Sequence, residues 1–145
     1  MSRINIGIDC NIYGSTLLGG LTRERFIELL RVKNMQSINI HYCDELIAEI
    51  LKLSTVLYFQ KKGISLETIE EFITFLKGRS IRVELKSKVE INRDKKDNYL
   101  LNLCLDANLD YLISGDKDLL DMESFGKTQI ITFKNYMETL EDMPF

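Results

Sequence analysis

The stretch Tyr-Leu-Ile-Ser-Gly-Asp, residues 111–116, decides how the chain is expected to fold. Residues suited to a buried strand are followed directly by a glycine and an acid, which end the strand. The stretch from Ile4 to Asp9 has the same form, with three isoleucines in five residues and then an aspartate. In open parallel sheets, ligands bind outside the carboxyl ends of the strands. Two such stretches therefore predict a sheet with functional acids along one edge.

Strand and helix patterns alternate along the rest of the chain. Further strands are expected at residues 38–42, 81–85 and 129–131. Helices are expected at residues 22–31, 44 to about 60, 66–77, 99–107 and 133–140, with Asp44, Ser65 and Thr132 as caps and a loop over 86–97. This alternation predicts an α/β fold in which helices cover both faces of a mainly parallel sheet of about five strands. One domain over residues 1–145 is expected.

Composition limits the class of protein. The length of 145 residues suits one domain, and the hydrophobic share of 45% is enough for a core. The net charge of −3 argues against simple electrostatic binding of a polyanion, unless several acids hold cations. Three widely spaced cysteines, with no CxxC pair, favour free thiols in a reducing cytoplasm. Neither a signal peptide nor a membrane span is indicated by the sequence.

Four acids are candidates for one metal site. Asp9 and Asp116 end strands, and Asp97 lies at an expected helix start. Glu45 and Glu49 share a helix face, and the helical pattern alone leaves these two nearly tied. Oxygen ligands without histidine or cysteine suit Mg²⁺ or Mn²⁺, which activates water and stabilises charge on a phosphodiester. The chemistry needs no histidine base, and the lone histidine lies within an expected strand.

Four segments of the chain resemble, in order, the successive motifs of PIN-domain ribonucleases. They are Ile8–Ile12, Asp44–Ile50, Arg93–Asn98 and Leu112–Leu119. The closest resemblance is to the subgroup of toxins of toxin–antitoxin systems similar to VapC. It extends over nearly the whole chain, and its most specific part is Ser114–Leu119. Cys10 replaces the usual threonine, and Lys95 and Phe133 stand where prolines are common.

The resemblance implies a PIN-like fold and a metal-dependent endoribonuclease. It maps the metal ligands onto Asp9, Glu49, Asp97 and Asp116, with Asp118 as a further acid near the metal and with Asn11 and Ser15 supporting the first aspartate. Because toxin members pair with an antitoxin and often dimerise, the expected partners are RNA, a protein antitoxin and a second copy of the chain. No membrane partner is expected.

Each acid also has a purely structural interpretation. Asp9 and Asp116 suit turns that end strands, and Asp97 suits a helix cap. The neighbouring basic residues either keep a loop soluble or contact RNA phosphates. The candidates for RNA contacts are Arg93, Lys95, Lys96 and Lys117, with Lys86 and Lys88 beside them.

Two other functions fit an α/β domain with acids at strand ends. A receiver-like signalling domain also binds Mg²⁺ there, but here the first strand ends in Asp-Cys rather than in a pair of acids. A catalytically silent module of the same fold that only binds a partner is the other alternative. The presence of all four acids argues against the silent module.

Overall fold

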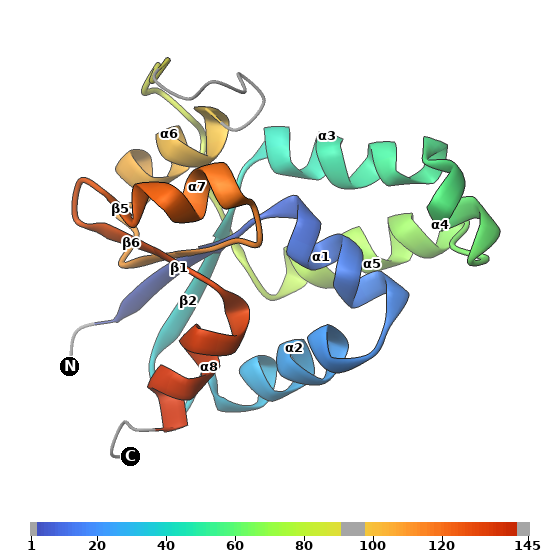
Figure 1. Cartoon of the computed structure of the whole chain (residues 1–145), viewed down its shortest axis with the longest axis horizontal. Helices are drawn as coiled ribbons and strands as arrows, with labels where there is room; N and C mark the ends of the chain where they lie inside the picture. Colours follow the sequence, from blue (N-terminus) through green and yellow to red (C-terminus); the bar gives the residue numbers. More distant parts are fainter. Residues whose placement is uncertain (1–2, 91–97, 142–145) are drawn as a thin grey trace.

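The computed structural model describes residues 3–90 and 98–141 and has an α/β fold (Figure 1). Its sheet has six strands in the order β3-β2-β1-β4-β6-β5. The strands are β1 (Ile4–Ile8), β2 (Ile38–Tyr42), β3 (Ile81–Arg82), β4 (Tyr111–Ile113), β5 (Ser124–Phe125) and β6 (Thr128–Ile131). All neighbouring strands are parallel except β5 and β6, which are antiparallel. The predicted mainly parallel α/β fold is confirmed, with one strand more than expected.

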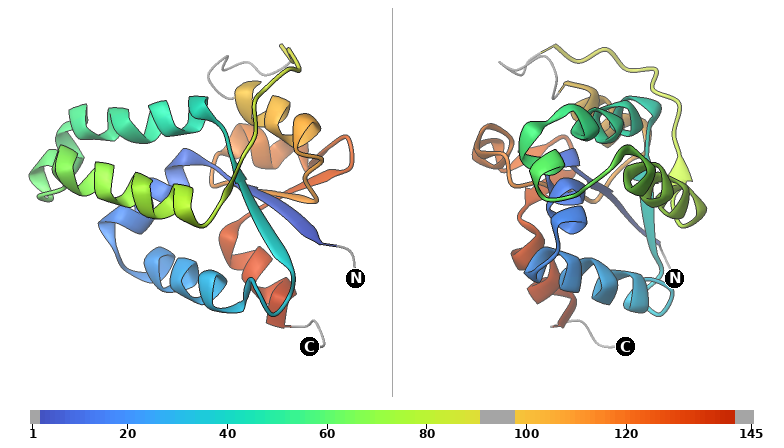
Figure 2. Two further views of the ribbon diagram at one scale, coloured as in Figure 1. Left: turned by 180° about the vertical axis from the view of Figure 1, so that it is seen from behind. Right: turned by 90° about the vertical axis from the view of Figure 1, so that its right-hand side faces the viewer.

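Helices connect the strands and cover the sheet. They are α1 (Cys10–Leu18), α2 (Leu21–Val32), α3 (Asp44–Lys52), the 3₁₀ helix η1 (Leu53–Thr55), α4 (Leu57–Lys61), α5 (Leu66–Gly78), α6 (Asn98–Asp106), α7 (Lys117–Met122) and α8 (Phe133–Glu141). Helices α3, α4 and α5 extend away from the sheet in both the front and the rear view (Figures 1 and 2). Within the described residues, no helix is long and apolar enough to cross a membrane.

The topology places a switch point beside β1. The chain builds outward through β2 and β3, and then returns to add β4 on the other side of β1. Right-handed crossovers on the two sides of such a point put the connecting helices on opposite faces of the sheet. The crevice between the carboxyl ends of the two strands at a switch point is where open α/β sheets bind ligands. This fold therefore directs attention to the ends of β1 and β4.

Two helices and one strand were not expected from the sequence. The α1 segment contains asparagine, glycine, serine and threonine, which are poor helix formers in isolation. It is helical because tertiary packing buries it: Tyr13 is fully buried and packs edge-on against Phe26 and Phe72. The α7 and β5 segments are six and two residues long, too short for a clear period.

The helix expected from residue 44 to about 60 is interrupted after Lys52. The hydroxyls of Ser54 and Thr55 donate to backbone carbonyls three residues earlier, at 2.9 and 2.7 Å. Such local hydrogen bonds compete with the helical ladder. Val56 then adopts an extended conformation, and the short helix α4 starts after it. The apolar pattern continued through this break, so the sequence did not reveal it.

Two of the three expected helix caps are confirmed, and one is wrong. Ser65 accepts a hydrogen bond from the Thr68 amide at 3.1 Å, and Thr132 accepts one from the Asn135 amide at 3.1 Å, so both caps are confirmed. Asp44 as a cap is wrong. Strand β2 runs directly into α3 with Cys43 at the cap position, and Asp44 is already the first helical residue. The Asp44 carboxylate forms a bidentate ion pair with Arg82 instead, at 3.0 and 2.6 Å.

Strand β3 is shorter than expected. Regular pairing ends at Arg82, whereas the prediction extended to residue 85. The described part of the predicted loop, residues 86–90, has no regular structure and is tied to α6. Asp106 accepts hydrogen bonds from the Lys86 and Ser87 amides at 2.7 and 3.0 Å. These contacts lead the chain over α6 rather than along the sheet edge, which explains the early end of β3.

Gly7 of β1 provides a test of the sheet–helix packing. A Cβ atom at this position would lie 2.8 Å from Leu109 Cδ1, with Leu103 of α6 and Leu112 also in contact. Gly7→Val is expected to lower the free energy of unfolding by about 1–3 kcal/mol, the usual cost of overpacking a core. Urea denaturation measures it. The control is Gly78→Ala, whose Cβ would meet nothing within 4 Å. Equal stability of the two variants would contradict this packing.

Candidate functional site

The ends of β1 and β4 meet at the switch point. Ile8 pairs with Ile113, and the Asp9 amide donates to the Ile113 carbonyl at 2.9 Å. Asp9 is 6% exposed and Ser114 is fully buried. The Ser114 hydroxyl donates to Asp9 Oδ2 at 2.7 Å, so a side-chain hydrogen bond joins the two strand ends. β1 and β4 are therefore neighbours, which is the condition under which acids at their ends lie on the same edge of the sheet.

Asp9 is held in an environment that disfavours its charge. Burial raises its pKa to about 6, while the hydrogen bonds from Ser114 and from the Cys10 amide oppose the rise. The negative charges of Glu49 and Asp116 raise it further. Among the described residues, none of the groups that shift this pKa is basic. Asp9 therefore lies where a cation would favour its ionised form.

Asp116 is connected to Asp9 through Ser114. Its amide donates to the Ser114 hydroxyl at 3.0 Å, and its own Oδ1 accepts from the Asp118 amide at 3.0 Å. Asp116 thus caps helix α7, a structural role that the sequence did not predict for it, and its charge also acts on Asp9. Asp118 follows in the first turn of α7 and is half-buried. Ser114 was not a predicted site residue, although its place in the Ser-Gly-Asp segment was a signal for it.

The structure separates Glu49 from Glu45. Glu49 is half-buried on α3, and its charge raises the pKa values of Asp9, Cys10 and Tyr99. Glu45 is exposed one turn earlier and acts instead on Cys43. Both residues occupy one helix face, but only Glu49 belongs to the group around Asp9. We use the name carboxylate cluster for Asp9, Glu49 and Asp116.

The charges of Asp9 and Glu49 act on one thiol, Cys10, and on one phenol, Tyr99. Burial and the charges of Glu49 and Asp9 raise the pKa of the Cys10 thiol to about 12. Burial likewise raises the pKa of Cys43 to about 12 and that of Tyr99 well above its usual range. These groups are protonated at neutral pH, so Cys10 is not suited to bind a cation as a thiolate.

Several predicted site residues lie outside the described part of the chain, and others lie at the periphery. Asp97, Arg93, Lys95 and Lys96 fall in the segment that the structure does not describe. Lys117 is described, exposed and ion-paired with Asp121 at 2.7 Å. Asn11 is exposed and Ser15 half-buried on α1. In the described residues, neither donates a side-chain hydrogen bond to Asp9, a role that Ser114 takes.

The carboxylate cluster offers oxygen ligands for a cation, but its three side chains do not surround one metal position in the described structure. Within residues 3–90 and 98–141, no three Asp, Glu, His or Cys side chains are grouped closely enough to hold a metal ion as placed. Mg²⁺, however, commonly keeps several waters and uses only one or two protein carboxylates. The residues fit such an ion by their chemistry, because Asp9 is a buried carboxylate with two others acting on it.

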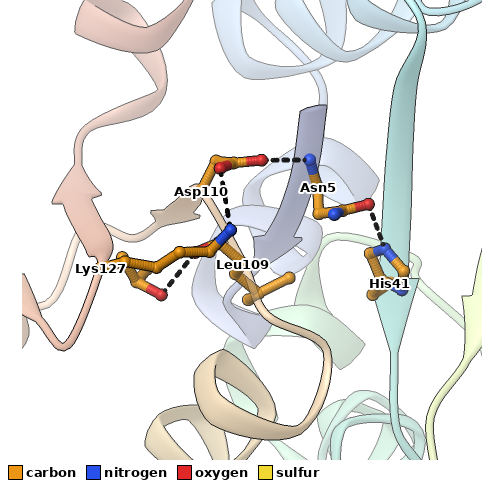
Figure 3. A network of polar contacts seen from close by, with 6 residues as sticks. Asn5, His41, Leu109, Asp110 and Lys127 are labelled. Atoms are coloured by element: carbon orange, nitrogen blue, oxygen red, sulfur yellow. Dashed lines mark hydrogen bonds and ion pairs between the residues drawn. The ribbon is translucent and has the colours of Figure 1, made fainter. Parts of the chain in front are cut away.

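A second polar network joins Asn5 of β1, His41 of β2, and Asp110 and Lys127, which directly precede β4 and β6 (Figure 3). His41 Nε2 lies 3.0 Å from Asn5 Oδ1, and the backbone N–H of Asn5 donates to Asp110 Oδ2 at 2.8 Å. Lys127 donates to the same Asp110 carboxylate at 3.3 Å. Burial lowers the pKa of His41. His41 thus lies within a strand, as expected, and belongs to a polar network that links β1, β2 and the start of β4.

Comparisons of the chain with protein-family models, with curated proteins and with solved structures found no match. Function is therefore inferred from the geometry at the ends of β1 and β4 and from the order of the sequence motifs.

Proposed function

We propose that this chain is a Mg²⁺- or Mn²⁺-dependent endoribonuclease that hydrolyses RNA phosphodiester bonds at the carboxylate cluster. The observation that carries the proposal is buried Asp9 at the switch point of the sheet, joined to Asp116 through the Ser114 hydroxyl and acted on by the charge of Glu49. Perturbed acids in such a crevice are typical of functional sites. Asp97 and Asp118 complete the proposed ligand set on the basis of the motif order.

The chain's own residues prepare the site. The Ser114 hydroxyl and the Cys10 amide orient the Asp9 carboxylate, and the α7 cap orients Asp116. Glu49 approaches from α3, on the other side of β1 from β4. When bound, a divalent cation would stabilise the negative charge that develops on the phosphodiester and would lower the pKa of a water molecule. In the proposed hydrolysis, a water oxygen bonds to phosphorus, a bridging P–O bond breaks, and the departing oxygen takes up a proton.

The biological setting that we propose is that of a type II toxin acting in the cytoplasm. It follows from the resemblance of the motifs to VapC-like toxins, whose activity a protein antitoxin blocks. A homodimer belongs to the same proposal. Co-expression with the product of an adjacent open reading frame tests it: growth arrest by the chain alone and rescue by the neighbour support it, and equal growth in both cases contradicts it.

The pair Glu49→Gln and Glu45→Gln tests the site with a matched control. Glu49→Gln is expected to reduce Mn²⁺-dependent cleavage of RNA by at least about 10-fold, because changing even a residue that only supports a metal ligand costs about 10- to 100-fold. Glu45→Gln, an identical change one turn away, is expected to leave cleavage within about twofold of wild type because Glu45 does not act on Asp9. Cleavage of a fluorophore–quencher RNA measures both. Equal losses of cleavage in the two variants would contradict the assignment of Glu49, rather than Glu45, to the site.

The alternatives make different predictions for the wild-type chain. A receiver-like domain would acquire phosphate from acetyl phosphate in the presence of Mg²⁺, and mass spectrometry would detect the added group. A silent binding module would neither cleave RNA nor gain thermal stability from Mn²⁺. Cleavage that requires Mn²⁺ and is abolished by EDTA is the result that we expect, and its absence across transfer and ribosomal RNA fragments would overturn the proposal.

A further inference from the structure

One end of the molecule is formed by the chain between α3 and α5, which projects away from the sheet (Figures 1 and 2). We use the name α4 tip for six exposed residues there: Lys52, Val56, Leu57, Tyr58, Lys61 and Lys62. Helices α1 and α3 pack together and run toward this tip. A Cβ atom on Gly14 of α1 would lie 3.2 Å from the Phe59 ring, so the absence of a side chain lets α4 approach α1 closely. The helix that follows Asp9 and the helix that carries Glu49 therefore both lead to the α4 tip.

The α4 tip exposes apolar side chains. Val56, Leu57 and Tyr58 follow one another at the start of α4, and Tyr58 is 56% exposed. Lys62 Nζ lies 5.5 Å from the centre of the Tyr58 ring, within the range of a cation–π contact. An exposed aromatic ring with a cation beside it is a surface on which a nucleic-acid base can stack.

The α4 tip is also basic, although the chain as a whole has a net charge of −3. Residues 50–66 contain three lysines and no acid. Lys52 is the last residue of α3, Lys61 is the last residue of α4, and Lys62 follows it. Local positive charge of this kind attracts a polyanion even where the net charge of the protein does not.

Lys52 connects the α4 tip to the carboxylate cluster. It follows Glu49 by three residues, so the two side chains share a face of α3 and are separated by about 4.5 Å along the helix axis. Tyr58 lies six residues further on, on the order of 15 Å from Glu49 along α3 and η1. A stacked single strand, at about 3.4 Å for each nucleotide, covers this distance with about five nucleotides.

We infer that the α4 tip is a second binding site for RNA, at which the Tyr58 ring stacks on a base and the lysines contact phosphates. This inference rests on the proposed function and adds a substrate class to it. Bases within a duplex stack on one another and are not free to stack on a protein ring, so the substrate is single-stranded RNA or an unpaired loop.

Tyr58→Ala is expected to weaken binding of a single-stranded RNA of about ten nucleotides by about 5- to 150-fold, the usual effect of removing an aromatic ring on which a base stacks. Tyr58→Phe keeps a ring for stacking and should bind within about twofold of wild type. Fluorescence anisotropy in EDTA measures binding without metal-dependent cleavage. In Mn²⁺, Tyr58→Ala should raise KM and leave kcat unchanged, because the contact is remote from the reacting phosphate.

Phe75→Ala is the matched control for Tyr58→Ala. Phe75 is also an exposed aromatic residue beside a cation, with Arg79 Cζ 3.8 Å from the centre of its ring. It lies on α5, outside the α4 tip, and its loss should leave the affinity for RNA unchanged. Equal losses of affinity in the two alanine variants would overturn the inference.

A fluorescence measurement tests the stacking directly. The chain contains no tryptophan, so Tyr58→Trp introduces a single indole at the α4 tip. Single-stranded RNA is expected to quench its fluorescence, whereas an abasic oligonucleotide of the same length, which has phosphates but no bases, should not. Phe75→Trp places the indole outside the α4 tip and should respond to neither.

The outcomes separate this inference from the proposed function. Wild-type affinity and KM for Tyr58→Ala, together with Mn²⁺-dependent cleavage, would overturn the α4 tip and leave the nuclease proposal standing. Equal quenching of Tyr58→Trp by the abasic oligonucleotide would overturn the stacking. A response to poly-glutamate but not to RNA would assign the α4 tip to an acidic protein and also overturn the inference. Tyr58-dependent binding without cleavage would support the α4 tip and overturn the nuclease proposal.

Discussion

Asp9→Asn is expected to abolish Mn²⁺-dependent RNA cleavage while leaving the fold intact. Asp9 is the most buried acid of the carboxylate cluster and the one on which Glu49 and Asp116 both act. Changes in residues that only support a metal ligand cost about 10- to 100-fold in affinity or activity, so loss of this ligand is expected to exceed about 100-fold. Asparagine keeps the size of the side chain and can still accept the Ser114 hydrogen bond. Initial rates of cleavage at increasing Mn²⁺ measure the effect.

A matched aspartate provides the control. Asp121 lies on α7, in the helix that Asp116 caps, but it is exposed and paired with Lys117. Asp121→Asn is expected to retain cleavage, because exposed pairs contribute little. Thermal shift should show that Mn²⁺ stabilises wild type and Asp121→Asn, and that Asp9→Asn loses this stabilisation. Undiminished metal-dependent cleavage by Asp9→Asn would refute the proposed site.

The stability of the metal-free protein should depend on pH through Asp9. The pKa of Asp9 is about 6 in the folded chain, against an ordinary value of 3.8. Below pH 3.8 the carboxyl is protonated in both the folded and the unfolded chain, and its contribution to stability is fully present. As the pH rises to about 6, the unfolded chain loses the proton first, which favours unfolding. The loss is complete above the folded pKa and amounts to about 3 kcal/mol.

Comparison with Asp9→Asn isolates this effect, since other acids titrate in both proteins. In EDTA, the free energy of unfolding of the variant minus that of wild type is expected to increase by about 2.4 kcal/mol between pH 4 and pH 7, because part of the loss already occurs below pH 4. Urea denaturation at half-unit steps of pH measures the difference. Saturating Mn²⁺ should reduce the slope for wild type, because a bound cation favours the ionised carboxylate. Parallel curves for the two proteins would show that Asp9 is not desolvated as the structure indicates.

Local patterns in the sequence determined most of the elements. Alternating strand and helix signals were sufficient for the α/β class, and serine and threonine at helix starts marked the caps at Ser65 and Thr132. Patterns could not identify α1, whose helix depends on burial of Tyr13 against Phe26 and Phe72, nor the break after Lys52. Propensity is a local quantity, and packing between distant segments overrides it.

For the site, the sequence by itself placed Asp9 and Asp116 at strand ends, because a strand that stops at an acid is visible in the order of residues. Only the tertiary structure decided that the two strands are neighbours, that Ser114 joins their ends, and that Glu49 rather than Glu45 acts on Asp9. Strand order and burial arise from contacts between residues up to about a hundred positions apart, as between Asp9 and Ser114. No local pattern contains that information.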